Sequence, residues 1–271
     1  MSEAIEQPGG MALPRPMGIG AILGTAVQFY RRHWQTLLAI AAVVVVPVTL
    51  LQYLIGDWVH SQGEVTVSTG NGSVVTAPTW TAAVGGLLAA LAGVLMFSVL
   101  TGAITRAVAA EVAGEDPGVE QSYRFGFQRL GSVLLVSILV GLATIAGLIL
   151  FIIPGIYIGV RLAVSTEALV VENRRGTQAM ARSWALVGGH WWHAFATLLV
   201  AGLLTGVVNS LISAPFSGAG WVAQAIAAAV ATVITLPYGV LVGVLLYLDL
   251  RARKEALSLE TLRTDLRGSA A

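Results

Sequence analysis

The amino-acid sequence predicts an all-α polytopic membrane bundle of six transmembrane helices. Of its 271 residues, 56% are hydrophobic and only 11% are charged, whereas a soluble domain carries roughly 25% charged residues. Several apolar stretches reach the roughly 20 residues that a helix needs to cross a bilayer. The low charge therefore excludes an ordinary solvated surface, and the apolar stretches give the number of helices.

The six predicted spans pair into three antiparallel hairpins. Only Pro154-Gly155 separates the third span from the fourth, and so short a link forces the two helices to run antiparallel. Pro47 and Pro237 fall inside the first and sixth spans and should kink them. The spans cover residues 36–55, 82–109, 132–153, 156–171, 193–212 and 221–250.

An amphipathic segment precedes each hairpin, at residues 17–34, 118–130 and 177–189. Their apolar residues recur at the spacing of one helix face, which predicts helices lying in the membrane interface. The recurrence suggests a three-fold internal repeat with a pseudo-three-fold axis. The alternative is that any junction before a span looks amphipathic.

The remaining segments are polar. Residues 1–16 mix Gly, Pro and charge, and we expect a disordered tail. Residues 57–80 form a connection in which alternating residues flank Asn71-Gly72, which favours a β-hairpin. Residues 251–271 carry leucines at helical spacing and are predicted to form an amphipathic cytoplasmic tail.

The basic residues predict the orientation. The connections 57–80, 154–155 and 214–221 contain none of the 15 Lys and Arg residues. Because cytoplasmic loops are enriched in Lys and Arg, both termini are predicted to be cytoplasmic, in a multi-pass protein of the cell membrane. All but one of these basic residues are arginine, which indicates GC-rich coding and a bacterial source.

Four sequence motifs carry a resemblance to a known family. They read LLAIAAVVVVP, IIPGIYIGVRLAVSTEALVVEN, AMARSWALVGGHWW and YLDLRARKEALSLETL. Together they resemble the glycerophosphoryl diester phosphodiesterase membrane-domain family, and in particular its standalone actinobacterial members. The resemblance covers about Gly18 to Leu262, and Ser258 departs from the acidic residue that the family pattern leads us to expect.

The resemblance implies a membrane fold and location, and it brings no catalytic residues with it. The family takes its name from proteins that fuse this region to a soluble phosphodiesterase barrel. Such a barrel needs a scaffold of roughly 250 residues that carries clustered carboxylate and His ligands. This sequence holds no such barrel, so we expect no phosphodiesterase activity.

Four charged residues fall within the predicted spans: Arg106, Arg161, Glu167 and Asp249. Charge in a span is costly and is usually paired or functional. We expect Arg106, Glu167 and Asp249 to form a shared polar cluster near the cytoplasmic side. It would be a structural link between hairpins, or an ion or substrate site, or a set of side chains that reach toward water.

A second group of basic residues suits anionic lipid headgroups. Its members are Arg174, Arg175, Arg251, Arg253 and Lys254. The positive-inside rule would place the same residues there without any lipid site. His33, His190 and His193 flank tryptophans and are interpreted as interfacial anchors, because a metal site needs three or four converging ligands.

No catalytic or cofactor motif appears: HExxH, GxSxG and P-loop patterns are all missing from the sequence. We therefore predict a non-enzymatic scaffold or accessory protein, with membrane lipids and a membrane protein as partners and no cofactor, metal or nucleic acid. A transporter or permease subunit that uses the intramembrane charges is the alternative. An intramembrane lipid-modifying enzyme ranks third.

Overall fold

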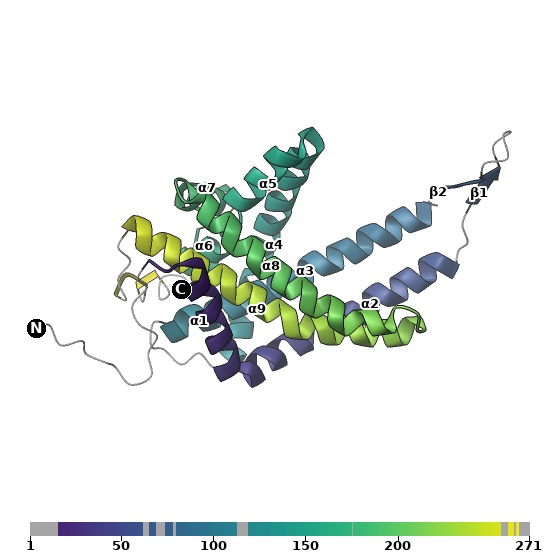
Figure 1. Ribbon diagram of the computed structural model, residues 1–271, viewed down its shortest axis with the longest axis horizontal. Helices are drawn as coiled ribbons and strands as arrows, with labels where there is room; N and C mark the ends of the chain where they lie inside the picture. The colour runs from purple at the N-terminus through teal and green to yellow at the C-terminus, as the bar shows by residue number, and fades with distance from the viewer. Residues whose placement is uncertain are drawn as a thin grey trace, which may run out of the picture.

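The computed structural model is an all-α polytopic bundle, as predicted from the sequence (Figure 1). It describes residues 16–61, 65–68, 74–77, 80–112, 119–174, 176–255, 260–262 and 264–265. Within these residues, six candidate spans are long and apolar enough to cross a membrane. The elements are α1 (Ile19–Arg32), α2 (Trp34–Ser61), β1 (Val65–Ser68), β2 (Val74–Ala77), α3 (Trp80–Val112), α4 (Val119–Leu150), α5 (Ile152–Arg161), α6 (Ser165–Glu172), α7 (Thr177–Val187), α8 (Trp191–Ser213), η1 (Ala214–Phe216) and α9 (Trp221–Glu255).

Some predicted features lie outside the described residues. They are the N-terminal tail up to residue 15, the Asn71-Gly72 turn, Arg175 and the end of the chain from residue 266. Residues 65–68 and 74–77, which flank that turn, pair as the antiparallel strands β1 and β2, with Val65 opposite Ala77 and Ser68 opposite Val74.

Helix α9 lies at the centre of the bundle. Its span is 56% buried inside the molecule, against 11% for the span of α8. It packs against both α2 and α8, while α3 packs between α2 and α4. Because these helices surround α9, a continuous run of its residues from Val240 to Leu250 is buried and forms part of the core. The helix continues through Pro237 and ends at Glu255, so the first residues of the predicted tail belong to it.

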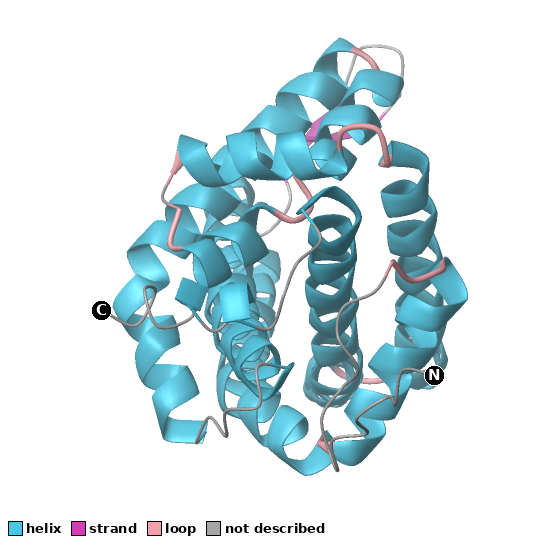
Figure 2. Cartoon of the chain, turned by 90° about the vertical axis from the view of Figure 1, so that its left-hand side faces the viewer, coloured by secondary structure: helices cyan, strands magenta, loops and turns pink. Residues whose placement is uncertain are grey.

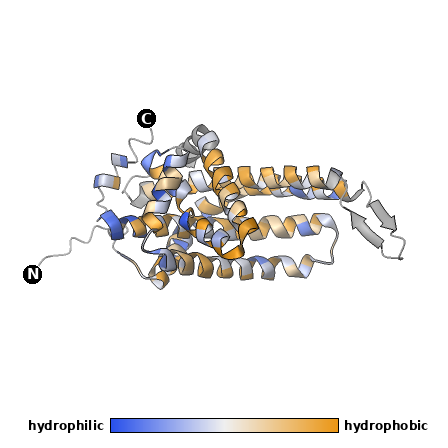
Figure 3. Ribbon diagram, turned by 90° about the horizontal axis from the view of Figure 1, so that it is seen from above, coloured by the Kyte–Doolittle hydropathy of each residue, from blue (hydrophilic) through white to orange (hydrophobic). Residues whose placement is uncertain are grey.

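The two ends of the bundle differ in character. We call the end that holds α1, α7 and the last turns of α9 the polar end, and the end that holds β1 and β2 the hairpin end (Figure 1). Figure 3 shows hydrophobic residues along the length of the helices and most hydrophilic ones at the polar end. Figure 2 looks onto the polar end, where short loops join the helices.

Two of the three amphipathic segments form separate helices, and the second does not. His33 ends α1 with φ −117° and ψ 23°, and Gly189, at a φ of +83°, separates α7 from α8. The segment predicted at 118–130 is instead the first part of α4, which runs unbroken into the third span. Gly131 stands between the amphipathic segment and the third span. A single glycine lowers helix stability by only about 1 kcal/mol, which is too little to end α4 there.

The link between the third and fourth spans also differs from the prediction. The connecting residue is Phe151, with φ −163° and ψ 151°, and Pro154 and Gly155 lie in the first turn of α5. Proline is tolerated there because the first N–H groups of a helix have no partner within it. Gly155 permits the close antiparallel packing, since a Cβ atom at this position would lie 2.4 Å from Leu148 Cγ.

The predicted fourth span is broken into two helices. Helix α5 ends at Arg161, residues 162–164 form a turn, and α6 begins at Ser165. Hydroxyl groups bind the backbone that the break releases: Ser165 Oγ donates to Leu162 O at 2.7 Å, and Ser183 Oγ donates to Arg161 O at 2.9 Å. Such bonds allow a helix to break at membrane depth. No Gly or Pro lies in the turn, so no local residue pattern predicts this break.

Candidate functional site

Glu172 is the centre of a charged network at the polar end. It is the last residue of α6, and its carboxylate accepts hydrogen bonds from Arg182 Nε at 2.8 Å and from Tyr247 Oη at 2.8 Å. Arg251 Nε lies 3.6 Å from the same carboxylate. The Glu172 network, made of Glu172, Arg182, Tyr247, Arg251 and Glu255, thus joins α6, α7 and α9.

Arg182 links two carboxylates that come from different helices. Besides Glu172, its guanidinium binds Glu255 of α9, with Nη1 2.5 Å from Oε1. Burial by itself would lower the pKa of Arg182, but the hydrogen bonds to Glu255 and Glu172 outweigh burial and raise the pKa. The side chain is only 15% exposed, so this pair is better shielded from solvent than a surface ion pair.

Two basic side chains hold the C-terminal end of α7. Arg161 Nη1 donates to Trp184 O at 2.8 Å, and Lys254 Nζ donates to Ala185 O. Arg161 also lies over the Trp184 ring, with Cζ 4.6 Å from the ring centroid. Positive charge at a helix C-terminus is favourable because the last carbonyl groups carry partial negative charge. Helix α7 is therefore fixed by α5 on one side and α9 on the other.

Asp249 forms a second cluster, which ties α1 to the bundle. Its carboxylate is fully buried and accepts hydrogen bonds from the backbone N of Met17 at 2.6 Å and from Arg253 Nε at 2.8 Å. His193 Nε2 lies 3.0 Å from it, and Arg253 Nη2 also donates to Met17 O at 2.6 Å. We call Asp249, His193, Arg253 and Met17 the Asp249 cluster.

Glu167 lies apart from both groups. It sits in the first turn of α6 and is 5% exposed. Its Oε1 atom faces Gly243 of α9, where a Cβ atom would lie only 2.8 Å away. Its Oε2 atom has no hydrogen-bond partner among the described residues, and the same holds for the buried hydroxyls of Thr101 and Thr105. These two threonines belong to α3, which packs against α6.

The structure does not assemble the polar cluster predicted from Arg106, Glu167 and Asp249. Glu167 contacts α9 at Gly243, whereas Asp249 lies six residues further along that helix. At about 100° per residue, the two positions are roughly 120° apart around the axis. Arg106 is half-buried on α3, and the Asp249 carboxylate binds Met17, His193 and Arg253.

The basic residues that were expected to bind lipid headgroups lie in different environments. Arg251 cannot reach a headgroup, because its side chain is 5% exposed and binds Asp265, Glu172 and Glu255. Arg253 is occupied in the Asp249 cluster. Arg174 and Lys254 are exposed, although Arg174 also pairs with Glu172 at 2.7 Å.

Sequence reasoning missed the residues that hold the Glu172 network together. They are Glu172, Arg182, Tyr247 and Glu255. One signal was present, because Arg251 and Glu255 stand four residues apart, as ion pairs on one helix do. The pairing of Arg182 with Glu255 joins residues 73 positions apart, and no local spacing predicts such a pair. His193, interpreted as an interfacial anchor, contacts Asp249.

Two cavities are lined by described residues. One, of about 420 Å³, lies between α3, α4 and the turn that joins α5 to α6, and Gly93, Ser137 and Thr166 are among its lining residues. The other, of about 490 Å³, lies at the hairpin end between α2 and α9. Neither Arg161 nor Glu167 lines either of them.

The described residues contain no group of three or more His, Asp or Glu side chains arranged to hold a metal ion. Their arrangement can fix helices to one another through ion pairs and can hold one buried carboxyl group at the helix break. Comparison with protein-family models gave no match, and comparisons with curated proteins and with solved structures gave none either.

Proposed function

We propose that the chain is a non-enzymatic integral membrane protein that acts as a scaffold or accessory protein for lipid and membrane-protein partners. The observation that supports this most is the Glu172 network. The charges of Glu172, Arg182 and Arg251 are bound to one another and to neighbouring helices. Groups bound in this way stabilise the bundle and are not free to bind or activate a substrate.

The lipid-facing surface supports the same proposal. Helix α8 buries little of its span and exposes large apolar side chains, among them Leu203 at 60% and Leu211 at 71%. Exposed apolar residues in such number fit contact with lipid or with another membrane helix. Arg161 and Glu167 line neither of the two cavities described above, whereas a transporter that used these charges would bring a solute pathway to them.

The proposed orientation places the polar end in the cytoplasm of a bacterial cell. Lys and Arg are absent from positions 33–105 and 183–250. These stretches contain the hairpin-end parts of α2, α3, α8 and α9. The positive-inside rule then places the hairpin end outside. Membership of the glycerophosphoryl diester phosphodiesterase membrane-domain family stays a prediction from the sequence motifs, and it agrees with a role that requires no catalysis.

Site-specific photocrosslinking in cells tests the accessory role. A photoreactive amino acid at Leu203 or Leu211 should give an adduct of one discrete protein mass in addition to lipid adducts. The matched control is Ala201 on the same helix, which is 5% exposed and should give no intermolecular adduct. If the exposed positions yield only lipid adducts, the accessory role is wrong.

A second candidate function, transport, is favoured by one specific observation. The buried Glu167 carboxyl, with its unpartnered Oε2 atom, lies just after the helix break at residues 162–164. Broken helices at membrane depth are a feature of transporter binding sites. A proton or sodium flux into proteoliposomes that Glu167→Gln abolishes, and that the exposed variant Glu260→Gln leaves unchanged, would replace the scaffold proposal with this one.

A further inference from the structure

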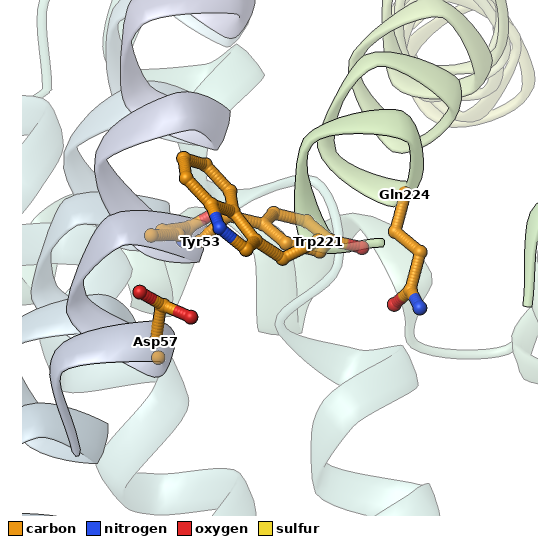
Figure 4. A pocket seen from close by; sticks show the side chains of 6 residues that line it. Tyr53, Asp57, Trp221 and Gln224 are labelled. Atoms are coloured by element: carbon orange, nitrogen blue, oxygen red, sulfur yellow. The ribbon is translucent and has the colours of Figure 1, made fainter. Parts of the chain in front are cut away.

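The groove at the hairpin end has the chemistry of a binding site. Its six lining residues come from two helices, with Gln52, Tyr53, Gly56 and Asp57 on α2 and Trp221 and Gln224 on α9. Figure 4 shows Trp221 of α9 extending toward Tyr53 and Asp57 of α2, with Gln224 on the side of α9 away from them. Its volume of about 490 Å³ lies within the usual range of roughly 300–1,000 Å³ for ligand pockets.

The α2 wall is suited to a cation. Tyr53 and Asp57 are four residues apart and share one helix face. Gly56, which follows Tyr53 on that wall, leaves open space where a side chain would stand. Asp57 is exposed and makes no ion pair with the described residues, and no Lys or Arg lies in the sequence from 33 to 105. A carboxylate beside an aromatic ring is the combination that binds an ammonium group.

The α9 wall has the opposite polarity. Trp221 is the first residue of α9, so the unpaired N–H groups of the first turn give this wall a partial positive charge. Helix N-termini of this kind bind phosphate. Gln224 fixes the approach to the helix by donating from Nε2 to Ser217 O at 3.2 Å and to Ala219 O at 2.8 Å. The groove therefore presents a negative wall and a positive wall to the same ligand.

We propose that this groove binds the zwitterionic headgroup of a phospholipid that carries an ammonium group, such as phosphatidylethanolamine. The ammonium lies against Asp57 and the aromatic rings of Tyr53 and Trp221, and the phosphate lies at the start of α9. The acyl chains follow the apolar flanks of the two helices, where Leu54 and Ile226 are 50% and 56% exposed. An anionic lipid without an ammonium group would bind less well, because its negative charge would be repelled by the carboxylate of Asp57.

This inference rests on the proposed lipid contact and names the lipid, but it does not depend on a protein partner. Native mass spectrometry of the full chain in mild detergent tests it, with phosphatidylethanolamine and phosphatidylglycerol of identical acyl chains as probes. The wild-type protein should retain phosphatidylethanolamine in preference to phosphatidylglycerol. Asp57→Asn should reduce that preference about tenfold, as expected for the loss of a hydrogen bond to a charged group, and Trp221→Ala should weaken it.

The control is Trp80→Ala, which removes another tryptophan of the hairpin end that is 75% exposed and does not line the groove. It should leave the preference unchanged. Equal retention of the two lipids by wild type, or an unchanged preference in Asp57→Asn, would overturn the inference. Binding of free phosphoethanolamine in place of the lipid would overturn the assignment to a membrane lipid. Retention of phosphatidylethanolamine without any protein crosslink would refute the accessory role alone.

Discussion

Gly243 of α9 lies directly against the carboxyl group of Glu167, and a Cβ atom at position 243 would stand 2.8 Å from Oε1. The carboxyl group of the buried glutamate therefore occupies space that a side chain at this residue of the central helix would enter. This contact joins α6 and α9 close to the helix break.

Gly243→Ala should displace the Glu167 carboxyl group and destabilise the protein by about 1 kcal/mol, the low end of the cost of overpacking a core, because the displaced atoms are the end of a flexible side chain. The measurement is thermal unfolding in detergent, followed by size-exclusion chromatography. Gly239→Ala is the matched control, because nothing lies within 4 Å of a Cβ atom there. The double variant Gly243→Ala/Glu167→Ala should recover part of the loss. Equal effects at the two glycines would contradict the proposed contact.

Arg182→Ala should lower stability far more than Arg174→Ala, although both residues pair with Glu172. The Arg182 side chain is 15% exposed and that of Arg174 is 48% exposed. Removing one partner of a buried pair costs about 3–5 kcal/mol, whereas an exposed pair contributes about 0–1 kcal/mol. The same unfolding assay measures both, and comparable losses would show that Arg182 does not hold the network.

Replacing Arg161 should loosen α7 in a graded way. Tyr157→Phe removes one hydrogen bond, from Arg161 Nε to the Tyr157 hydroxyl, and keeps the ring. Arg161→Ala removes in addition the bond to Trp184 O and the contact with its ring. Hydrogen exchange in residues 177–187 should rise slightly in the first variant and strongly in the second. An exchange rate that stays at the wild-type value in Arg161→Ala would refute this anchoring.

Asp249→Asn should release α1 from the bundle. The carboxylate binds the backbone N of Met17 and pairs with Arg253, and a neutral amide cannot hold both groups as strongly. Hydrogen exchange should increase over residues 19–32, with Glu260→Gln as a control at an exposed acidic residue. A change confined to α9 would mean that Asp249 stabilises its own helix and does not anchor α1.

The orientation can be tested directly, because the chain has no cysteine of its own. Ser217→Cys, in the loop before α9, should react with a membrane-impermeant maleimide in intact cells. Gln178→Cys, exposed on α7 at the polar end, should react only after the membrane is opened. The reverse pattern would place the termini outside.

The helices followed from the sequence because a bilayer imposes a one-dimensional requirement. A span needs about 20 apolar residues, and that length is visible in the chain without knowledge of its neighbours. All six predicted spans correspond to candidate spans of the structure. The break at residues 162–164 was missed because its stability depends on Ser183, a residue of α7 that donates to Arg161 O, and no local signal reports such a partner.

The sequence by itself determined that the protein is a six-span helical bundle and which residues are costly to place in a membrane. Only the tertiary structure decided which of them meet. Glu167 and Asp249 lie on different sides of the central helix, and Arg182 pairs with Glu255 across 73 residues. The cost of burying a charge depends on its depth in the membrane, and the position of the residue along a span gives that depth. The partner of the charge depends on how each helix is rotated against its neighbours, which no local pattern in the chain specifies.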